Sequence, residues 1–510
     1  MKIILGLIAC FCMAFTNLYS QSISNSSKEK FIAEFDAYIS EVLKNTDIPA
    51  IGISILSGGK PVFIKTYGFA NKEAGIKADN NTLFYIASST KSFTALAAAL
   101  LDKEGKIKLN EPMNKYMGSL KFKNPIPAEQ ITIKHLLTHT AGLTNEALGF
   151  RMAFSGDIKD YEIDHVFTGA MTYADTMFNK YNYDNLGYNI YAVLLRKHLK
   201  LNWQDVLATK IFKPVDMNHT TSYMSEAVRK GWNVAAPYQA IGNNGAVLTE
   251  LPKQDNNLQS AGGIFSSPND LAKWIEVNMN KGKIDGRQVF AKEILEKCQT
   301  GYASVERTMQ PFTGLSQYGL GWIIGDYKKE KVIYHFGGFP GYSGHISFMP
   351  DKKIGVAITT NESIMGSRVA TVLATFAYDW WLNEHGMDTI YEGKKNELKQ
   401  MYEGYKRASA KDIESKSKRP SKLSLPLTNY TGVFTNEFCG TMKIFVKDAV
   451  LNAALGNMQS SSTHFTQEEA IRVELIPGSG QVIKFMKDEK NSITKLVYNE
   501  FEFIRMSNKD

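Results

Sequence analysis

Residues 84–101 read FYIASSTKSFTALAAALL, and the rest of the chain is best understood from this stretch. It begins as a short apolar run, turns polar at Ser88-Ser89-Thr90-Lys91, and continues as a run rich in alanine and leucine. Alanine and leucine are strong helix formers, so we expect a buried helix that opens at Ser88. Positions i and i+3 share one face of a helix, which would place the side chains of Ser88 and Lys91 together.

The spacing Ser-x-x-Lys is common in this chain, and only its surroundings distinguish one copy from the others. The copies in a predicted turn, a linker, a strand and the leader boundary begin at Ser57, Ser415, Ser492 and Ser27. Only Ser88 opens an apolar helix. A nucleophilic serine needs a base within hydrogen-bond reach, and Lys91 is the candidate. The alternative is that Ser88 does no more than cap the helix.

Lys91 can act as a base only after it loses its proton. A free lysine titrates near pH 10.4, so half-deprotonation at pH 7 requires a pKa lowered by about 3.4 units. Burial of the ammonium group and a nearby cation can lower the pKa by that amount. We therefore expect Lys91 to be buried and its pKa to be lowered.

Two further motifs occur once each. Tyr183-Asp184-Asn185 precedes a predicted helix, and His335-Phe336-Gly337 ends a predicted strand before Gly338. A phenol can pass a proton between nucleophile and leaving group, while a carboxamide can bind a substrate amide and the lysine. We expect the glycine strand to be an edge strand along which a substrate lies, with one backbone N–H stabilising an oxyanion.

In this order, the three motifs resemble those of the serine β-lactamase and penicillin-binding family. The chain is most similar to class C β-lactamases and their esterase and peptidase relatives, over roughly Phe31 to Leu382. Flanking stretches are also similar: Phe84–Ser88, Ile131–Leu143, Ala261–Ile264 and Tyr318–Trp322. The segment from Thr428 to Met506 resembles a small β domain often appended to such enzymes.

The resemblance implies a role for each motif residue. Ser88 is acylated, Lys91 is the base, Tyr183 is the partner acid/base, and Asn185 binds substrate. The N–H groups of Ser88 and Gly338 would form the oxyanion hole, and His335 and Gly337, on the same strand as Gly338, would contact the substrate. Neither a cofactor nor a metal is implied.

One position departs from the family pattern. Many members carry a lysine where this chain has His335, and that lysine engages a substrate carboxylate. A histidine with a pKa near 6.5 is mostly neutral at pH 7.5, so we expect uncharged esters or amides to be better substrates than penicillins.

The implied activity is hydrolysis of an ester, a D-amino-acid peptide or a β-lactam amide through an acyl-enzyme. An alternative is a penicillin-binding sensor that is acylated with negligible turnover, although Tyr183 favours turnover. A third possibility, an inactive scaffold, is disfavoured because all three motifs are present. The expected partner is a small-molecule or peptide substrate.

The pattern of apolar residues predicts an α+β fold in which an antiparallel sheet is flanked by helices, with an all-helical lobe and a small all-β domain. The predicted domain boundaries are 28–385 for the hydrolase, 386–425 for a basic helical linker and 426–510 for the β domain. The formal charge of +8 is concentrated in the linker. Residues 392–425 hold ten basic and five acidic side chains, a net charge of 10 − 5 = +5. Such a segment is typical of a solvated tether, and we expect no nucleic-acid partner.

Residues 1–20 have a basic start, a short apolar run and a polar exit, which predicts a secretory signal peptide and a periplasmic or secreted protein. Leu7-Ile8-Ala9-Cys10 also matches a lipoprotein box, and membrane contact would then depend on a lipid at Cys10. Beyond the leader only Cys298 and Cys439 remain, and they are predicted to be unpaired thiols. His135 and His139 have metal-like spacing, but the glutamate of a zinc motif is missing, so a structural role is favoured.

Overall fold

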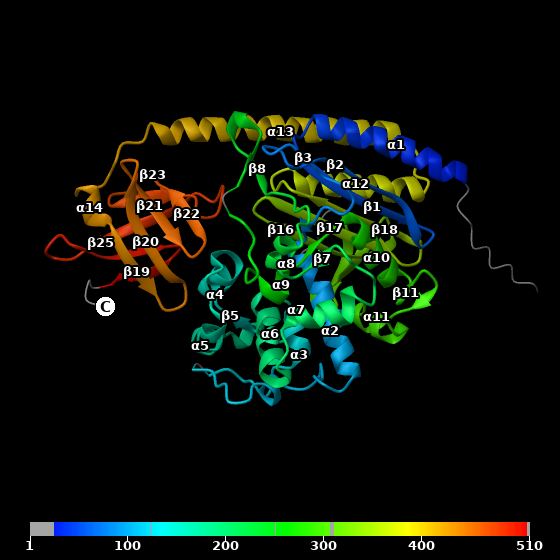
Figure 1. The fold of residues 1–510 in the computed structure, drawn as a ribbon, viewed down its shortest axis with the longest axis horizontal. Helices are drawn as coiled ribbons and strands as arrows, with labels where there is room; N and C mark the ends of the chain where they lie inside the picture. The colour runs from blue at the N-terminus through cyan, green and yellow to red at the C-terminus, as the bar shows by residue number, and fades with distance from the viewer. Residues whose placement is uncertain (1–24, 124, 250, 307–310, 507–510) are drawn as a thin grey trace, which may run out of the picture.

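The computed structural model describes residues 25–123, 125–249, 251–306 and 311–506, shown in Figure 1. The predicted signal peptide and Cys10 lie outside this range. The predicted α+β class is confirmed: the chain forms two antiparallel sheets of nine strands each, and in Figure 1 a helical lobe lies below the first sheet and beside the second. Among the described helices, none is long and apolar enough to cross a bilayer.

The first large sheet has the strand order β13-β14-β15-β16-β17-β18-β1-β2-β3. In that order the strands span Ala303–Val305, Thr313–Tyr318, Ile323–Tyr327, Glu330–Phe339, Tyr342–Met349, Ile354–Thr360, Ala50–Ser57, Lys60–Asn71 and Ile76–Lys77. β1 forms the expected hairpin with β2 and also pairs with β18, where Ile51 lies opposite Thr360. The N-terminal strands therefore complete a sheet begun by the C-terminal strands.

Helices cover both faces of this sheet. α1 (Asn25–Lys44), α12 (Gly366–Trp381) and α13 (Met387–Ser417) lie on one face, and α10 (Pro268–Met279) packs against β1 and β18 on the other. Four apolar positions spaced along α1 are fully buried, as the helical periodicity predicts: Phe31, Phe35, Ile39 and Val42. Phe31 and Phe35 contact aromatic side chains of α12, and the ring centroids of Phe35 and Phe376 lie 5.4 Å apart.

The helical lobe is built around α2 (Thr90–Lys103), whose side chains are almost all buried. Phe93 stacks on Trp274 of α10, with ring centroids 3.7 Å apart. The lobe also contains α3 (Ile133–Leu137), α4 (Glu146–Phe150), α5 (Asp160–Ala170), α6 (Leu186–Leu199), α7 (Trp203–Leu207), α8 (Met224–Arg229), α9 (Gln259–Gly262) and α11 (Lys292–Cys298).

The segment predicted as a linker is mostly helix α13, about 46 Å long at 1.5 Å per residue. Tyr391, Leu398 and Tyr402 are buried against the body of the protein, and the Tyr391 hydroxyl donates to Asp379 of α12 at 2.8 Å. The N-terminal part of α13 is therefore a packed element rather than a free tether.

The second large sheet forms the C-terminal β domain, with the order β22-β21-β20-β19-β27-β26-β25-β24-β23. In that order its strands span Met458–Ser461, Val450–Leu455, Gly440–Lys447, Gly432–Asn436, Phe501–Arg505, Ile493–Tyr498, Gln481–Lys487, Ala470–Val473 and Thr463–His464. Its neighbours in Figure 1 are α4 and α5 of the helical lobe.

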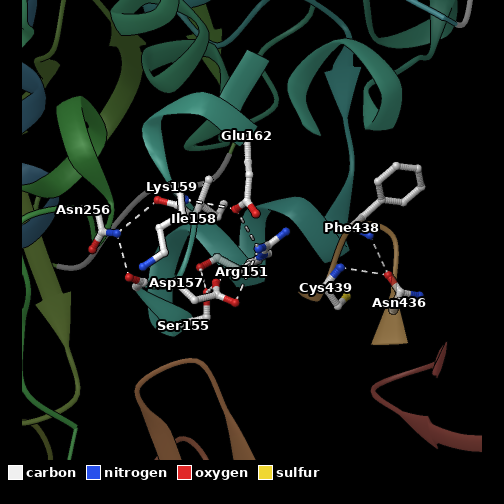
Figure 2. Close-up of polar contacts among 11 residues, drawn as sticks. Arg151, Ser155, Asp157, Ile158, Lys159, Glu162, Asn256, Asn436, Phe438 and Cys439 are labelled. Carbon is white, nitrogen blue, oxygen red and sulfur yellow. Dashed lines mark hydrogen bonds and ion pairs between the residues drawn. The ribbon is translucent and has the colours of Figure 1, made fainter. Parts of the chain in front are cut away.

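The contact between the β domain and the helical lobe is close and well packed. The Asn457 N–H donates to the Ser155 carbonyl at 2.7 Å, and a β-carbon on Gly456 would lie only 2.4 Å from that same oxygen. Figure 2 shows Arg151, paired with Asp157 at 3.0 Å, facing the loop of the C-terminal β domain that carries Cys439. Cys298 and Cys439 are both buried free thiols.

Candidate active site

Ser88 lies in a single 3₁₀ turn, Ala87–Ser89, that leads directly into α2. Its side chain is half-buried, and no side-chain hydrogen bond caps either the turn or the helix. The preceding residue, Ala87, has a φ of 42°, a strained value for a residue with a β-carbon. The geometry therefore does not support a capping role, and Ser88 Oγ remains available for chemistry.

Lys91 is fully buried one turn further along, beneath Ser88. Its Nζ lies 3.2 Å from Ser88 Oγ, 2.7 Å from Asn185 Oδ1 and 2.9 Å from the Ala261 carbonyl oxygen. Burial lowers the pKa of Lys91 to about 7, although the nearby Asp184 carboxyl acts in the opposite direction.

The partners of Lys91 restrict what a neutral amine can do at this position. A neutral amine has two N–H donors and one lone pair. The amide oxygen of Asn185 and the carbonyl of Ala261 can only accept, so they take the two N–H groups. The lone pair is then left for Ser88 Oγ. The similarity of the stretch Ala261–Ile264 to the family did not predict this contact with Lys91, because only the backbone of Ala261 takes part.

Tyr183 and Asn185 come from the loop that leads into α6, and Asn185 is the N-cap residue of that helix. The Tyr183 ring is 42% exposed and lies over Lys91, with Nζ 4.8 Å from the ring centroid. Desolvation raises the pKa of the Tyr183 hydroxyl, and a hydrogen bond with Ser88 partly offsets this rise. The structure thus brings the first two motifs together around Ser88 Oγ.

His139 holds the loop that carries Tyr183 and Asn185 through two hydrogen bonds. The Asp184 N–H donates to His139 Nδ1 at 3.3 Å, and the Asn182 N–H donates to the His139 carbonyl at 2.8 Å. Burial and the neighbouring Lys91 keep the pKa of His139 well below its usual value, so the ring is neutral. The structural role expected for His139 is therefore a positioning role for the second motif. No group of three or more potential metal-binding side chains is found in the described parts of the chain.

The third motif lies on β16, which is an internal strand and not the edge strand predicted from its glycines. However, β15 pairs with β16 only as far as Tyr334. From His335 to Phe339 the strand pairs with β17 alone, so its other edge is free beside Ser88. The prediction was wrong because the glycines indicate a close backbone approach, which does not require the end of a sheet.

Gly337 makes that close approach. A β-carbon at Gly337 would lie 2.0 Å from the Ile86 carbonyl oxygen, whereas a β-carbon at Gly338 would meet nothing within 4 Å. The two glycines therefore differ: Gly337 packs against the turn that carries Ser88, and Gly338 faces open space.

His335 is 3% exposed, and burial together with the nearby Lys91 lowers its pKa to about 3. The expected pKa near 6.5 is therefore wrong, because a sequence does not show burial. Nδ1 lies 2.8 Å from the Phe336 carbonyl, which can only accept, so Nδ1 carries the proton. Nε2 lies 3.3 Å from the Tyr318 hydroxyl. His335 is thus neutral, and both ring nitrogens have protein partners.

Ser88 lies where two halves of one cleft meet. The first half, with a volume of about 960 Å³, extends past His335 and Phe336 to α12 and α13, where it contains Arg368, Lys394 and Glu397. The second half, about 680 Å³, extends toward the C-terminal β domain. An extended substrate could therefore lie on both sides of the serine.

Comparison with known proteins gives consistent results. The Beta-lactamase family model matches residues 35–379. Protein flp of Staphylococcus aureus is 24% identical over 337 residues, which are 64% of this chain, and the chain spans 62% of the length of that relative. Unguisins hydrolase ungD of Aspergillus violaceofuscus is 24% identical over 470 residues, 87% of this chain and 81% of that protein.

Among solved structures, the octameric penicillin-binding protein homologue from Pyrococcus abyssi is similar in fold. The TM-score is 0.57 at 24% identity, and the match covers 93% of this chain and 100% of that one.

Proposed function

Since the chain belongs to the β-lactamase family, we propose that it is a serine hydrolase that works through an acyl-enzyme on Ser88. The observation that carries this proposal is the arrangement of Lys91: a fully buried amine with a pKa near 7 whose free lone pair points to Ser88 Oγ. A lysine that is half neutral at pH 7 can accept the serine proton without a large energetic cost.

In acylation, Lys91 accepts the Ser88 proton while Oγ bonds to the carbonyl carbon of the substrate. The N–H groups of Ser88 and Gly338 stabilise the oxyanion, and in related chemistry one such donor contributes about 10²–10³ in rate. The proton then passes from Lys91 through the Tyr183 hydroxyl to the leaving group as its bond to carbon breaks. In deacylation, water gives up its proton by the reverse route and releases the acid, restoring Ser88.

We place the substrate among esters, D-amino-acid peptides and β-lactam amides, the range of class C enzymes, carboxypeptidases and esterases. His335 is neutral and adds no cation to the binding strand, which favours uncharged groups near the reacting carbonyl. The match to a relative named as a hydrolase extends over most of the chain and supports hydrolysis rather than acylation alone.

Intact-mass analysis tests this function directly. The native chain is expected to gain one fluorophosphonate label at Ser88, to hydrolyse nitrophenyl acetate, and to lose both properties in Ser88→Ala. Labelling that persists in Ser88→Ala would sink the assignment. A stable penicillin adduct without turnover of any ester or D-amino-acid peptide would instead support the sensor function.

Export is a separate proposal based on residues 1–20. N-terminal sequencing of the protein from its source cells is expected to begin near Gln21. A lipid-modified N-terminus at Cys10 would replace the signal-peptide proposal with a lipoprotein anchor.

A further inference from the structure

The second half of the cleft is built jointly by the hydrolase domain and the C-terminal β domain. Its walls include Phe150, Phe154 and Phe339 from the hydrolase domain and Pro477 from the loop between β24 and β25 of the tail. All side chains that line this half are uncharged. The other half contains Arg368, Lys394 and Glu397, so the two halves differ in chemistry on either side of Ser88.

The loop of the C-terminal β domain that carries Pro477 is held against this wall by close contacts. Gly478, next to Pro477, has a φ of 76°, and a β-carbon there would lie 2.4 Å from Gln239 Nε2. The aromatic ring of Tyr498 from the tail lies 5.9 Å from that of Phe150. Because Ser155 also accepts from Asn457, the segment that carries Phe150 and Phe154 is fixed by the tail itself.

Gln239 supplies a polar group next to Pro477 in this uncharged wall, which also contains Asn185 and several serines. It lies on β8 (Tyr238–Ala240), is 6% exposed and lines the cleft beside Pro477. Within the described residues, its amide oxygen is buried and has no hydrogen-bond partner. A buried acceptor without a partner is costly, and rotation of the Gln239 side chain toward the cleft would let a ligand N–H relieve the cost.

From these observations we infer that the C-terminal β domain is a specificity element of the hydrolase. Together with Phe150, Phe154 and Gln239, it binds an uncharged, apolar, amide-bearing portion of the substrate, as found in a hydrophobic peptide. This inference rests on the proposed function, because the bound portion is recognised beside the scissile bond at Ser88.

Three nitrophenyl esters test the inference. They are the acetate, the ester of N-acetylphenylalanine, and the analogue of the latter in which oxygen replaces the amide N–H. Both enantiomers of the two large esters are used. In a second series, the same phenylalanine-derived group is attached to the leaving alcohol instead of to the acyl carbon. We compare the native chain with Gln239→Met, Pro477→Ala and, as a matched control in the same domain, Pro426→Ala.

Gln239→Met is expected to lower kcat/KM for the amide-bearing ester about tenfold in one of the two series, because the substrate N–H then loses its hydrogen-bond acceptor. The same variant should change kcat/KM for the oxygen analogue less than about twofold. Pro477→Ala is expected to lower kcat/KM for both large esters about threefold, since part of an apolar wall is lost. Acetate hydrolysis and the Pro426→Ala control are expected to stay at native values.

Fluorophosphonate labelling separates the two proposals. If Ser88 is labelled normally but neither Gln239→Met nor Pro477→Ala distinguishes the substrates in either series, the inference about the tail is overturned and the hydrolase function stands. Equal losses on all three esters also overturn it, because they would show a general effect on folding. If the native chain is not labelled, both proposals are overturned.

Discussion

The side-chain hydroxyl of Ser89 donates a 3.2 Å hydrogen bond to the backbone carbonyl oxygen of His335. This contact joins the nucleophile turn to β16 across 246 positions of sequence. The donor, Ser89, directly follows Ser88. The acceptor, His335, lies two residues before Gly337, whose backbone packs closely against the turn. The two backbone segments proposed to form the oxyanion hole are therefore held by both a hydrogen bond and a close packing contact.

The first prediction concerns the two glycines. Gly337→Ala would place a methyl group against the Ile86 carbonyl, so we expect the free energy of unfolding to fall by about 1–3 kcal/mol and Ser88 labelling to slow. The methyl group of Gly338→Ala would enter open space, so we expect the free energy of unfolding to change by less than about 0.5 kcal/mol. Urea unfolding of both variants checks this, and equal stability losses would contradict it.

The second prediction concerns the pH dependence of the rate. Lys91 must be neutral to act as a base, so kcat/KM is expected to rise with pH through about 7 and to level off above it. Lys91→Arg remains cationic at all these pH values and should lower kcat/KM by about 10²–10⁴. Rates of a neutral ester from pH 5.5 to 9 test both. A flat profile in the native chain would rule out a lysine base with this pKa.

The third prediction is that Lys91 costs stability. Its pKa is about 7 when folded and 10.5 when unperturbed, so between these values the unfolded state binds the extra proton. The native free energy of unfolding therefore rises with pH in this window, by about 1.4 kcal/mol per unit relative to a variant without the amine. Lys91→Met should be more stable than native protein near pH 7, and its advantage should shrink by pH 9. Urea unfolding at both pH values measures the change, and an advantage that grows with pH would refute it.

The fourth prediction separates two neighbouring tyrosines in the cleft. Tyr183→Phe keeps the ring over Lys91 but removes the proton relay, and kcat is expected to fall by about 10²–10⁴. Tyr181→Phe removes a hydroxyl from the same cleft and should change kcat by less than about threefold. Steady-state and burst kinetics on nitrophenyl esters distinguish the two variants. Similar losses in both would remove the special role of Tyr183.

The fifth prediction concerns His335. Because its pKa is lowered to about 3, it stays neutral from pH 5.5 to 8.5. The ratio of kcat/KM for a carboxylated substrate to that for its neutral analogue is therefore expected to be constant over this range, and His335→Lys should raise it. A tenfold fall of the ratio between pH 5.5 and 7.5 would show that His335 titrates near its ordinary pKa.

Local sequence patterns predicted much of this structure. The spacing of Ser88 and Lys91, the strand signals around Gly337 and the apolar face of α1 depend on neighbouring residues, so the chain reveals them directly. The expected burial of Lys91 follows from the same apolar helix, and the structure shows it.

The remaining features depend on contacts between distant segments. The pairing of β16 with β15, the burial of His335 and the Ala261 carbonyl beside Lys91 arise from tertiary packing, which a single sequence does not encode locally. The same holds for Gln239 and Pro477, which lie on opposite sides of a domain contact. An unpaired amide oxygen becomes visible only when its surroundings are known.

The pairing of β1 with β18 has a consequence for the order of folding. The partner of Ile51 on β18 is Thr360, so β1 has no neighbour other than β2 until the ribosome has added about 300 further residues. Sheets closed by such distant contacts fold slowly, because the entropy of a long loop is lost before the pairing is gained. The helical lobe, which lies between these strands in the sequence, can collapse first. The sheet that supports β16 beside Ser88 would then be among the last parts of the molecule to form.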